Sequence, residues 1–135
     1  MARAPRLALV SVLAITLAMV VSCGTCPPAP FITSISPSST TAGDGQFLLI
    51  VNGNEFRRDS VVSWNGSFRV TSFVSNHQLV AVITAADIAQ PGTVLVFAFN
   101  PQEGGTTFVS GGLGVISTTV CVGKTSTGVS FTITP

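Results

Sequence analysis

The chain has 135 residues, of which 46% are hydrophobic and only 8% charged, and its formal net charge is +1. This length limits the chain to one domain of ordinary size. The near-neutral charge provides neither the basic surface that nucleic acid requires nor an acidic tail that would point to a charged partner. Charge this scarce is typical of membrane proteins, but the apolar residues are unevenly spread and gather at the N-terminus.

The N-terminal residues have the pattern of an export signal. Arg3 and Arg6 form a short positive region, and residues 7–21 form an apolar run that only two hydroxyl residues interrupt. A helix of that length rises about 22 Å at ~1.5 Å per residue, which is too short for the ~30 Å hydrocarbon core of a bilayer. The pattern therefore predicts a secretory signal peptide over residues 1–22 rather than a membrane span.

The end of this signal resembles the lipobox of bacterial lipoproteins. Val20 and Val21 are apolar, Ser22 is small, and Cys23 follows them. The resemblance implies that the mature chain begins at Cys23, which carries a diacylglyceryl thioether and an acylated amine. Several acyl chains, at ~0.8 kcal/mol per buried CH₂, would anchor the protein almost irreversibly. Gly24 is compatible with sorting to the outer membrane if the host is diderm. The alternative is a plain cleavage site beside a chance cysteine.

A proline-rich stretch, residues 23–30, separates the signal from the first predicted strand. Its three prolines fix φ and disfavour helix, so we expect a stiff, extended tether. At ~3.3 Å per residue this tether reaches only about 25 Å, which would keep the domain close to its membrane. Loss of the signal leaves 113 residues with four basic and five acidic side chains, and this net charge of −1 opposes nucleic-acid binding.

Residues 31–135 carry the period-two alternation of a β-protein, in short runs bounded by turn formers. The alternating apolar positions are Phe47, Leu49 and Val51, then Leu79, Ala81 and Ile83, then Val94, Val96 and Ala98, and finally Val129, Phe131 and Ile133. Residues 85–89 form one helical turn at most. About seven short strands at this spacing predict an all-β, immunoglobulin-like β-sandwich.

Asn65 and Gly66 form the strongest hairpin signal in the chain. They separate residues 61–64 from residues 68–71, and both of these segments are rich in strand-forming residues. Asn-Gly is the dipeptide that two-residue hairpin turns prefer, because both central residues adopt positive φ. The two segments are therefore predicted to pair as antiparallel strands.

An ordered set of motifs resembles the IPT/TIG domain, the immunoglobulin-like domain of plexins and transcription factors, and its bacterial members most of all. The motifs are residues 32–37 (ITSISP) with 42–43, residues 49–56 (LIVNGNEF), residues 60–66 (SVVSWNG), residues 78–88, residues 92–101 and residues 129–134. Together they cover residues 31 to about 103 and 128 to 134. The resemblance implies an immunoglobulin-like fold and a domain that serves as a spacer or interaction module.

Residues 102–128 depart from the family pattern, in which a short Gly-rich loop precedes the last strand. Residues 106–110 and 115–122 are β-like, so we expect an added hairpin or one long loop. In an immunoglobulin sandwich such a loop lies at the pole where the chain enters the fold.

Cys26 and Cys121 are expected at that same pole. An exported protein is oxidised, and assignment of Cys23 to lipid leaves an even pair. We therefore predict a Cys26–Cys121 disulfide, which contributes ~4–5 kcal/mol on the chain-entropy model. Two free thiols are the alternative, because the path of the insertion is not known from the sequence.

No catalytic or metal-binding constellation emerges. Cys23 and Cys26 have C-x-x-C spacing, but they precede the fold and one of them belongs to the lipobox. One histidine and two remaining cysteines cannot supply the four ligands of a structural zinc site. His77 lies in a polar loop, and no G-x-S-x-G elbow occurs. We therefore expect no enzyme, no cofactor, no metal and no nucleic-acid partner.

Three side chains are candidates for binding. Trp64 has the ring that stacking on a sugar requires, but it follows Val62 at a spacing of two, so we expect it half-buried against the core. Leu48 and Ile50 flank core positions and should point outward, an exposed apolar pair larger than a monomer needs. A neighbouring strand, a partner or the insertion would cover them.

The function that these observations predict is a non-catalytic, lipid-anchored module of the bacterial cell envelope. It would act by protein or surface binding, in adhesion, assembly or a scaffold. Its partners would be the membrane, through Cys23, and an envelope protein or glycan. The alternative is a carbohydrate-binding envelope lipoprotein whose glycan affinity depends on Trp64. An enzyme is less favoured, because it would need a polar pocket built by residues 102–128.

Overall fold

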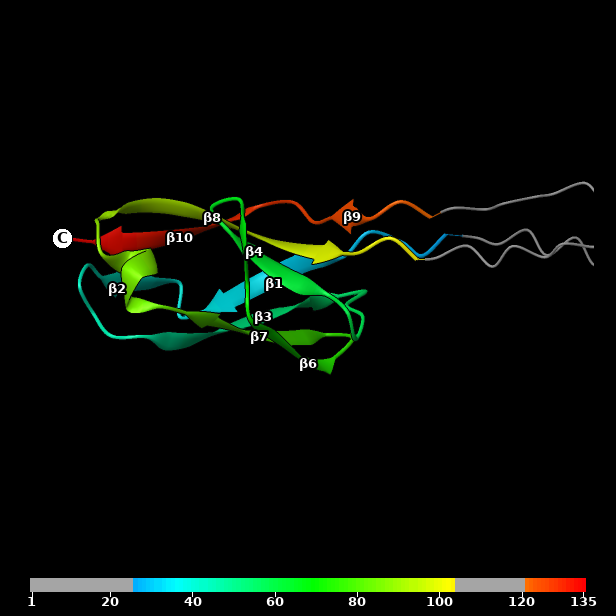
Figure 1. The fold of residues 1–135 in the computed structure, drawn as a ribbon, viewed down its shortest axis with the longest axis horizontal. Coiled ribbons are helices and arrows are strands. Elements are labelled where there is room, and N and C mark those ends of the chain that lie inside the picture. Colours follow the sequence, from blue (N-terminus) through cyan, green and yellow to red (C-terminus); the bar gives the residue numbers. More distant parts are fainter. Residues whose placement is uncertain (1–25, 104–120) are drawn as a thin grey trace, which may run out of the picture.

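Two β-sheets packed face to face form the domain in the computed structural model, which describes residues 26–103 and 121–135 (Figure 1). The four-stranded sheet has the order β1-β3-β7-β6, and the six-stranded sheet has the order β2-β10-β8-β4-β5, with β9 paired to β8. The strands are β1 (Phe31–Ser36), β2 (Ser39–Thr41), β3 (Phe47–Asn54), β4 (Val61–Trp64), β5 (Ser67–Arg69), β6 (Thr71–Ser75), β7 (Gln78–Ile83), β8 (Gly92–Asn100), β9 (Lys124–Thr125) and β10 (Val129–Thr134). The prediction of an all-β, immunoglobulin-like sandwich is confirmed.

The core lies between the two sheets and consists of the side chains that alternate inward along each strand. Ten of the twelve positions predicted from the alternation are buried: Leu49, Val51, Leu79, Ala81, Ile83, Val94, Val96, Ala98, Phe131 and Ile133. The other two, Phe47 and Val129, are partly buried and pack against this cluster. Phe131 is at its centre, with its ring centroid 4.9 Å from that of Trp64 and 5.7 Å from that of Phe47.

The N-terminal part of the domain crosses from one sheet to the other. β1 pairs with β3, and after the cis peptide bond between Ser36 and Pro37 the chain continues as β2 in the six-stranded sheet. There β2 runs parallel to β10, and the Ala42 N–H donates to the Thr134 carbonyl at 2.7 Å. The second and last strands are thereby hydrogen-bonded at the end of the sandwich that carries the C-terminus (Figure 1).

The predicted Asn65–Gly66 turn is confirmed. Asn65 has φ of 50° and Gly66 has φ of 84°, and Trp64 pairs with Ser67 across the turn. Both residues therefore adopt the positive φ that a tight hairpin turn demands.

The single strand predicted over residues 68–71 is wrong, because the chain changes sheets within it. β5 ends at Arg69 in the six-stranded sheet, and β6 begins at Thr71 in the four-stranded sheet. The Thr71 hydroxyl accepts a hydrogen bond from the Val62 N–H at 2.9 Å and donates to the Arg69 carbonyl at 2.8 Å. The side chain thus satisfies backbone groups that the crossing removes from the strand ladder.

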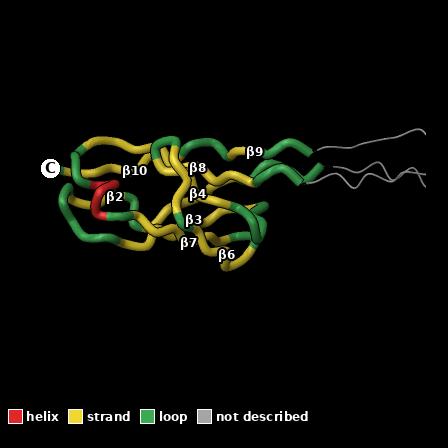
Figure 2. The backbone as a smooth tube through the Cα atoms, in the orientation of Figure 1, coloured by secondary structure: helices red, strands yellow, loops and turns green. Residues whose placement is uncertain are grey.

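One 3₁₀ turn, η1 (Ala85–Ile88), follows β7 and agrees with the single helical turn expected there (Figure 2). Its Asp87 carboxylate accepts hydrogen bonds from the Arg69 guanidinium at 2.5 and 2.9 Å and from the Thr84 N–H and hydroxyl, both at 3.0 Å. Burial of Asp87 opposes ionisation, but these bonds outweigh it and lower the pKa of the carboxyl below its ordinary value of 3.8. The pair joins the β4–β5 hairpin to η1.

Asp87→Asn should remove a pH-dependent part of the stability. Because the folded-state pKa is lowered, the ionised carboxylate stabilises the fold above pH ~4, and this contribution is lost as pH falls through the folded pKa. Loss of hydrogen bonds to a charged group should cost about 1.5–3 kcal/mol at pH 7. Urea unfolding at a series of pH values should show a smaller acid-side loss in Asp87→Asn and in Arg69→Gln than in the wild type. Unchanged pH dependence in both variants would contradict this role of the pair.

Candidate functional site

Cys26 and Cys121 form a disulfide at the end of the sandwich opposite the C-terminus, with Cα atoms 5.4 Å apart and a sequence separation of 95 (Figure 1). This confirms the predicted pairing. We call this end the disulfide pole and define it by Cys26, Cys121, Lys124, Arg57 and Glu103. The described parts of the insertion lie here too, since Glu103 forms a β-bridge with Cys121 and β9 pairs with the end of β8. The hairpin or long loop expected within residues 102–128 falls mainly on residues 104–120, which lie outside the described residues.

The disulfide pole also holds the chain that leads into the first strand. The Lys124 ammonium donates to the Pro27 carbonyl at 2.8 Å, and Pro30 is fully buried. Pro27 and Pro28 line a small cleft together with Cys121. Cys26, Pro27 and Pro30 therefore hold this stretch against the domain, while Pro28 and Ala29 are exposed. The physical reason is the disulfide, which brings Cys26 back against the sheet.

A buried polar pair, Ser60 and Asn100, lies next to the disulfide pole. The Ser60 hydroxyl donates to the Asn100 amide oxygen at 2.5 Å and accepts from the Arg57 N–H at 2.7 Å, while the Asn100 amide donates to the Glu55 carbonyl at 2.8 Å. Ser60 and Asn100 are both buried, so these bonds compensate for desolvation and fix the loop between β3 and β4 to the end of β8. Sequence reasoning missed the pair; two polar residues within otherwise apolar motifs were the available signal.

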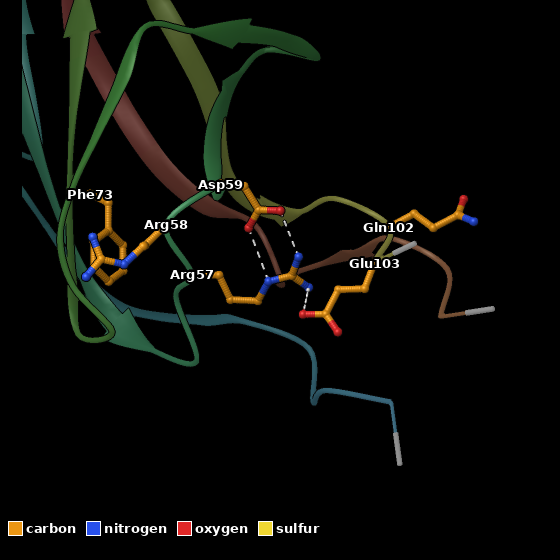
Figure 3. A pocket seen from close by; sticks show the side chains of 6 residues that line it. All are labelled: Arg57, Arg58, Asp59, Phe73, Gln102 and Glu103. Carbon is orange, nitrogen blue, oxygen red and sulfur yellow. Dashed lines mark hydrogen bonds and ion pairs between the residues drawn. The ribbon is translucent and has the colours of Figure 1, made fainter. Parts of the chain in front are cut away.

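A shallow hollow of about 720 Å³ opens beside the pole, lined by Arg57, Arg58, Asp59, Phe73, Gln102 and Glu103 (Figure 3). Arg57 lies between two carboxylates, 2.8 Å from Asp59 and 3.3 Å from Glu103. Arg58 lies over the Phe73 ring, 5.8 Å from its centroid. One guanidinium therefore holds both of the carboxylates that line the hollow.

The remaining candidates for site chemistry do not come together with this hollow. His77 has its Nδ1 3.2 Å from the Gly53 carbonyl, so the ring is engaged with the backbone of β3. Within residues 26–103 and 121–135, no group of three or more His, Cys, Asp and Glu side chains is placed to hold a metal ion. In the same ranges, no helix has the length and apolar character that a membrane crossing requires.

The middle of the outer surface of the four-stranded sheet is aliphatic and uncharged, and exposed polar side chains such as Ser36 and Ser72 flank it. Leu48 and Ile50 on β3 point outward as predicted, with 58% and 37% of their surfaces exposed. They pair in register with Val82 and Val80 of β7, which are half-buried. We call these four side chains the aliphatic face. No charged residue occurs anywhere in β1, β3, β6 or β7.

Trp64 lies deeper than expected. Only 2% of it is exposed, and its ring packs on Phe131, so it offers no platform for a sugar ring. This corrects the expectation of a half-buried residue. Inward alternation from Val62 fixed the direction of the side chain, and Phe131 of β10, two strands away in the same sheet, packs against its ring.

An exposed aromatic pair on the six-stranded sheet was missed by sequence reasoning. Phe68 on β5 is 61% exposed and stacks on Phe99 of β8 with centroids 5.4 Å apart. The available signal was in β8, where apolar residues occupy the outward as well as the inward positions, as Leu95, Phe97 and Phe99 show. An unbroken apolar strand predicts that both of its faces are covered at least in part.

Trp64→Ala should unfold the domain far more readily than Phe68→Ala. The first substitution opens a cavity beside Phe131 and should cost ~3–5 kcal/mol, whereas the second removes a surface stack worth ~0.5–1.5 kcal/mol. Urea unfolding followed by far-UV circular dichroism measures both without depending on tryptophan fluorescence. Equal losses in the two variants would contradict the placement of Trp64 in the core.

Comparison with protein-family models finds a match over most of the chain. The IPT/TIG domain matches residues 30–133, which is most of the chain and extends from buried Pro30 through nearly all of β10. No curated protein matches the chain.

Proposed function

The chain belongs to the IPT/TIG domain family, and from that premise we propose that it is a non-catalytic binding module held at the bacterial cell envelope by lipid on Cys23. Domains of this family commonly serve as binding or scaffold modules and are generally not enzymes. The side-chain arrangement in the hollow agrees with this, since its two acidic side chains are engaged by Arg57. The role is adhesion, assembly or scaffolding.

The observation that carries the proposal is the aliphatic face. Branched aliphatic side chains lie in register on two neighbouring strands, exposed on β3 and half-buried on β7. With no charge on the whole sheet, they form a larger apolar surface than a solitary module needs. The side chains beneath it, Leu49 and Leu79 among them, are fully buried, so the face is rigid before any partner arrives.

The chemistry of this face favours a protein over a glycan. Leu48, Ile50, Val80 and Val82 carry no flat ring for stacking on a sugar and no side-chain group for hydrogen bonding to hydroxyls. Apolar side chains of a second protein can fill the spaces between them and exclude water, as in the core of an ordinary interface. Burial of Trp64 removes the feature on which the carbohydrate alternative rested.

The anchor is tested by intact mass of the full chain extracted from bacterial membranes. We expect a wild-type chain that begins at Cys23 and carries acyl mass, because the preceding residues resemble a lipobox. Cys23→Ser should lack that mass and appear in the soluble fraction. The double variant Cys26→Ser/Cys121→Ser is the matched control and should stay with the membrane. An unacylated wild-type chain, or a membrane-bound Cys23→Ser, would exclude the anchor.

The binding face is tested by photo-cross-linking in cells. A photoreactive phenylalanine analogue at Leu48 should yield protein adducts, whereas the same analogue at Thr132, exposed on the six-stranded sheet, should not. Adding Ile50→Lys should abolish the Leu48 adducts, because an unpaired charge buried in an interface is costly. The substitution itself should change stability by less than ~1 kcal/mol at this exposed site. Adducts that are equal at both positions, or that survive Ile50→Lys, would rule out this face.

A further inference from the structure

We infer that the disulfide pole rests on the lipid bilayer, so that the domain stands on the membrane with its two sheet faces directed sideways. This inference rests on the proposed lipid anchor at Cys23. Its partner is the bilayer surface itself, and its basis is the length of chain between the lipidated residue and the first fixed point of the fold.

The disulfide moves that fixed point toward the anchor. Without it, the chain is first held at β1, and about 25 Å of extended tether separates Cys23 from Phe31 at ~3.3 Å per residue. With it, the domain is held at Cys26, only three residues from Cys23. Three residues span about 10 Å at most. Cys26 therefore lies within about 10 Å of the lipidated residue.

Cys26 is joined to the central part of the six-stranded sheet. Its disulfide partner Cys121 forms a β-bridge with Glu103, and Lys124 pairs with Asn100 at the end of β8 while its ammonium holds the Pro27 carbonyl. β8 lies between β10 and β4 in the sheet. These bonds fix Cys26 to the body of the domain, so the disulfide pole stays within the reach of the three-residue tether.

The surface at this pole suits the headgroup region. Val122 is 68% exposed beside the disulfide, and Phe31 at the start of β1 is also exposed. Arg58 is exposed over the Phe73 ring and forms no ion pair among the described residues. Apolar side chains next to cations are the composition that the membrane interface favours.

The positive and negative side chains at the pole are equal in number, and this balance limits how far electrostatic attraction can orient the domain. Arg57, Arg58 and Lys124 are matched by Glu55, Asp59 and Glu103. With no net charge, attraction to anionic lipid supplies little of the orientation. The orientation is therefore a consequence of the short tether and should not depend on the anionic lipid content.

The C-terminal end of the sandwich lies at the opposite pole, together with β2 and η1 (Figure 1). This end is directed away from the membrane when the disulfide pole rests on it. The aliphatic face then lies on the side of the upright domain, where a partner in the same envelope layer can reach it.

The test uses the acylated full chain in vesicles of phosphatidylethanolamine and phosphatidylglycerol that contain a lipid with a nitroxide on its headgroup. Val122→Trp places a fluorescent reporter at the disulfide pole, and Thr134→Trp places a matched reporter at the other end. The wild type, with Trp64 buried in the core, gives the background. We expect quenching of the Val122→Trp signal to exceed that of Thr134→Trp several-fold, and the latter to equal the background.

Two further measurements distinguish the short tether from anionic lipid as the cause of the orientation. In the Cys26→Ser/Cys121→Ser background the quenching at position 122 should fall, because the tether lengthens while the anchor remains. Vesicles in which phosphatidylcholine replaces phosphatidylglycerol should preserve the difference between the two reporters. Equal quenching at both poles in a vesicle-bound chain, or a difference that appears only with anionic lipid, would overturn the orientation alone. A chain that lacks acyl mass and does not bind vesicles would overturn the proposed anchor and the orientation with it.

Discussion

The disulfide between Cys26 and Cys121 is the constraint on which the organisation of this domain depends. It closes a loop that contains nearly the whole fold, and on the chain-entropy model such a loop contributes ~4–5 kcal/mol by restricting the unfolded chain. It also docks residues 26–30 against the sheet and places the start of the domain beside the returning insertion. The same bond therefore stabilises the fold and holds the start of the domain against the sheet.

Charge and apolar surface are segregated in this small molecule. The charged side chains lie mainly in loops at the ends of the sandwich, and the four-stranded sheet has none. At the disulfide pole they neutralise one another, with Arg57 shared between Asp59 and Glu103. The aliphatic face is thus left to short-range apolar contact. This division suits a module that is attached at one pole and binds through a face.

Local patterns predicted much of the fold because they report on single strands and turns. Alternation identified the inward side chains of β3, β7, β8 and β10, and Asn65–Gly66 fixed the hairpin. The same reasoning failed at residues 68–71, where the chain leaves one sheet for the other at the edge of the hairpin. An alternation of apolar and polar residues with a period of two does not indicate which sheet a strand joins. The Ser60–Asn100 pair was missed for a related reason, since its partners are 40 residues apart.

The sequence by itself determined the class of fold, the family, the direction in which Leu48, Ile50 and Trp64 point, and the identity of the two cysteines left to pair, because these depend on local spacing and residue chemistry. Only the tertiary structure decided how deeply Trp64 is buried, that Phe68 and Phe99 stack on the outer surface, and that the chain after Cys26 is docked on the domain. Those features arise where distant strands meet. Burial and docking are set by what covers a residue, and the covering residues come from elsewhere in the chain.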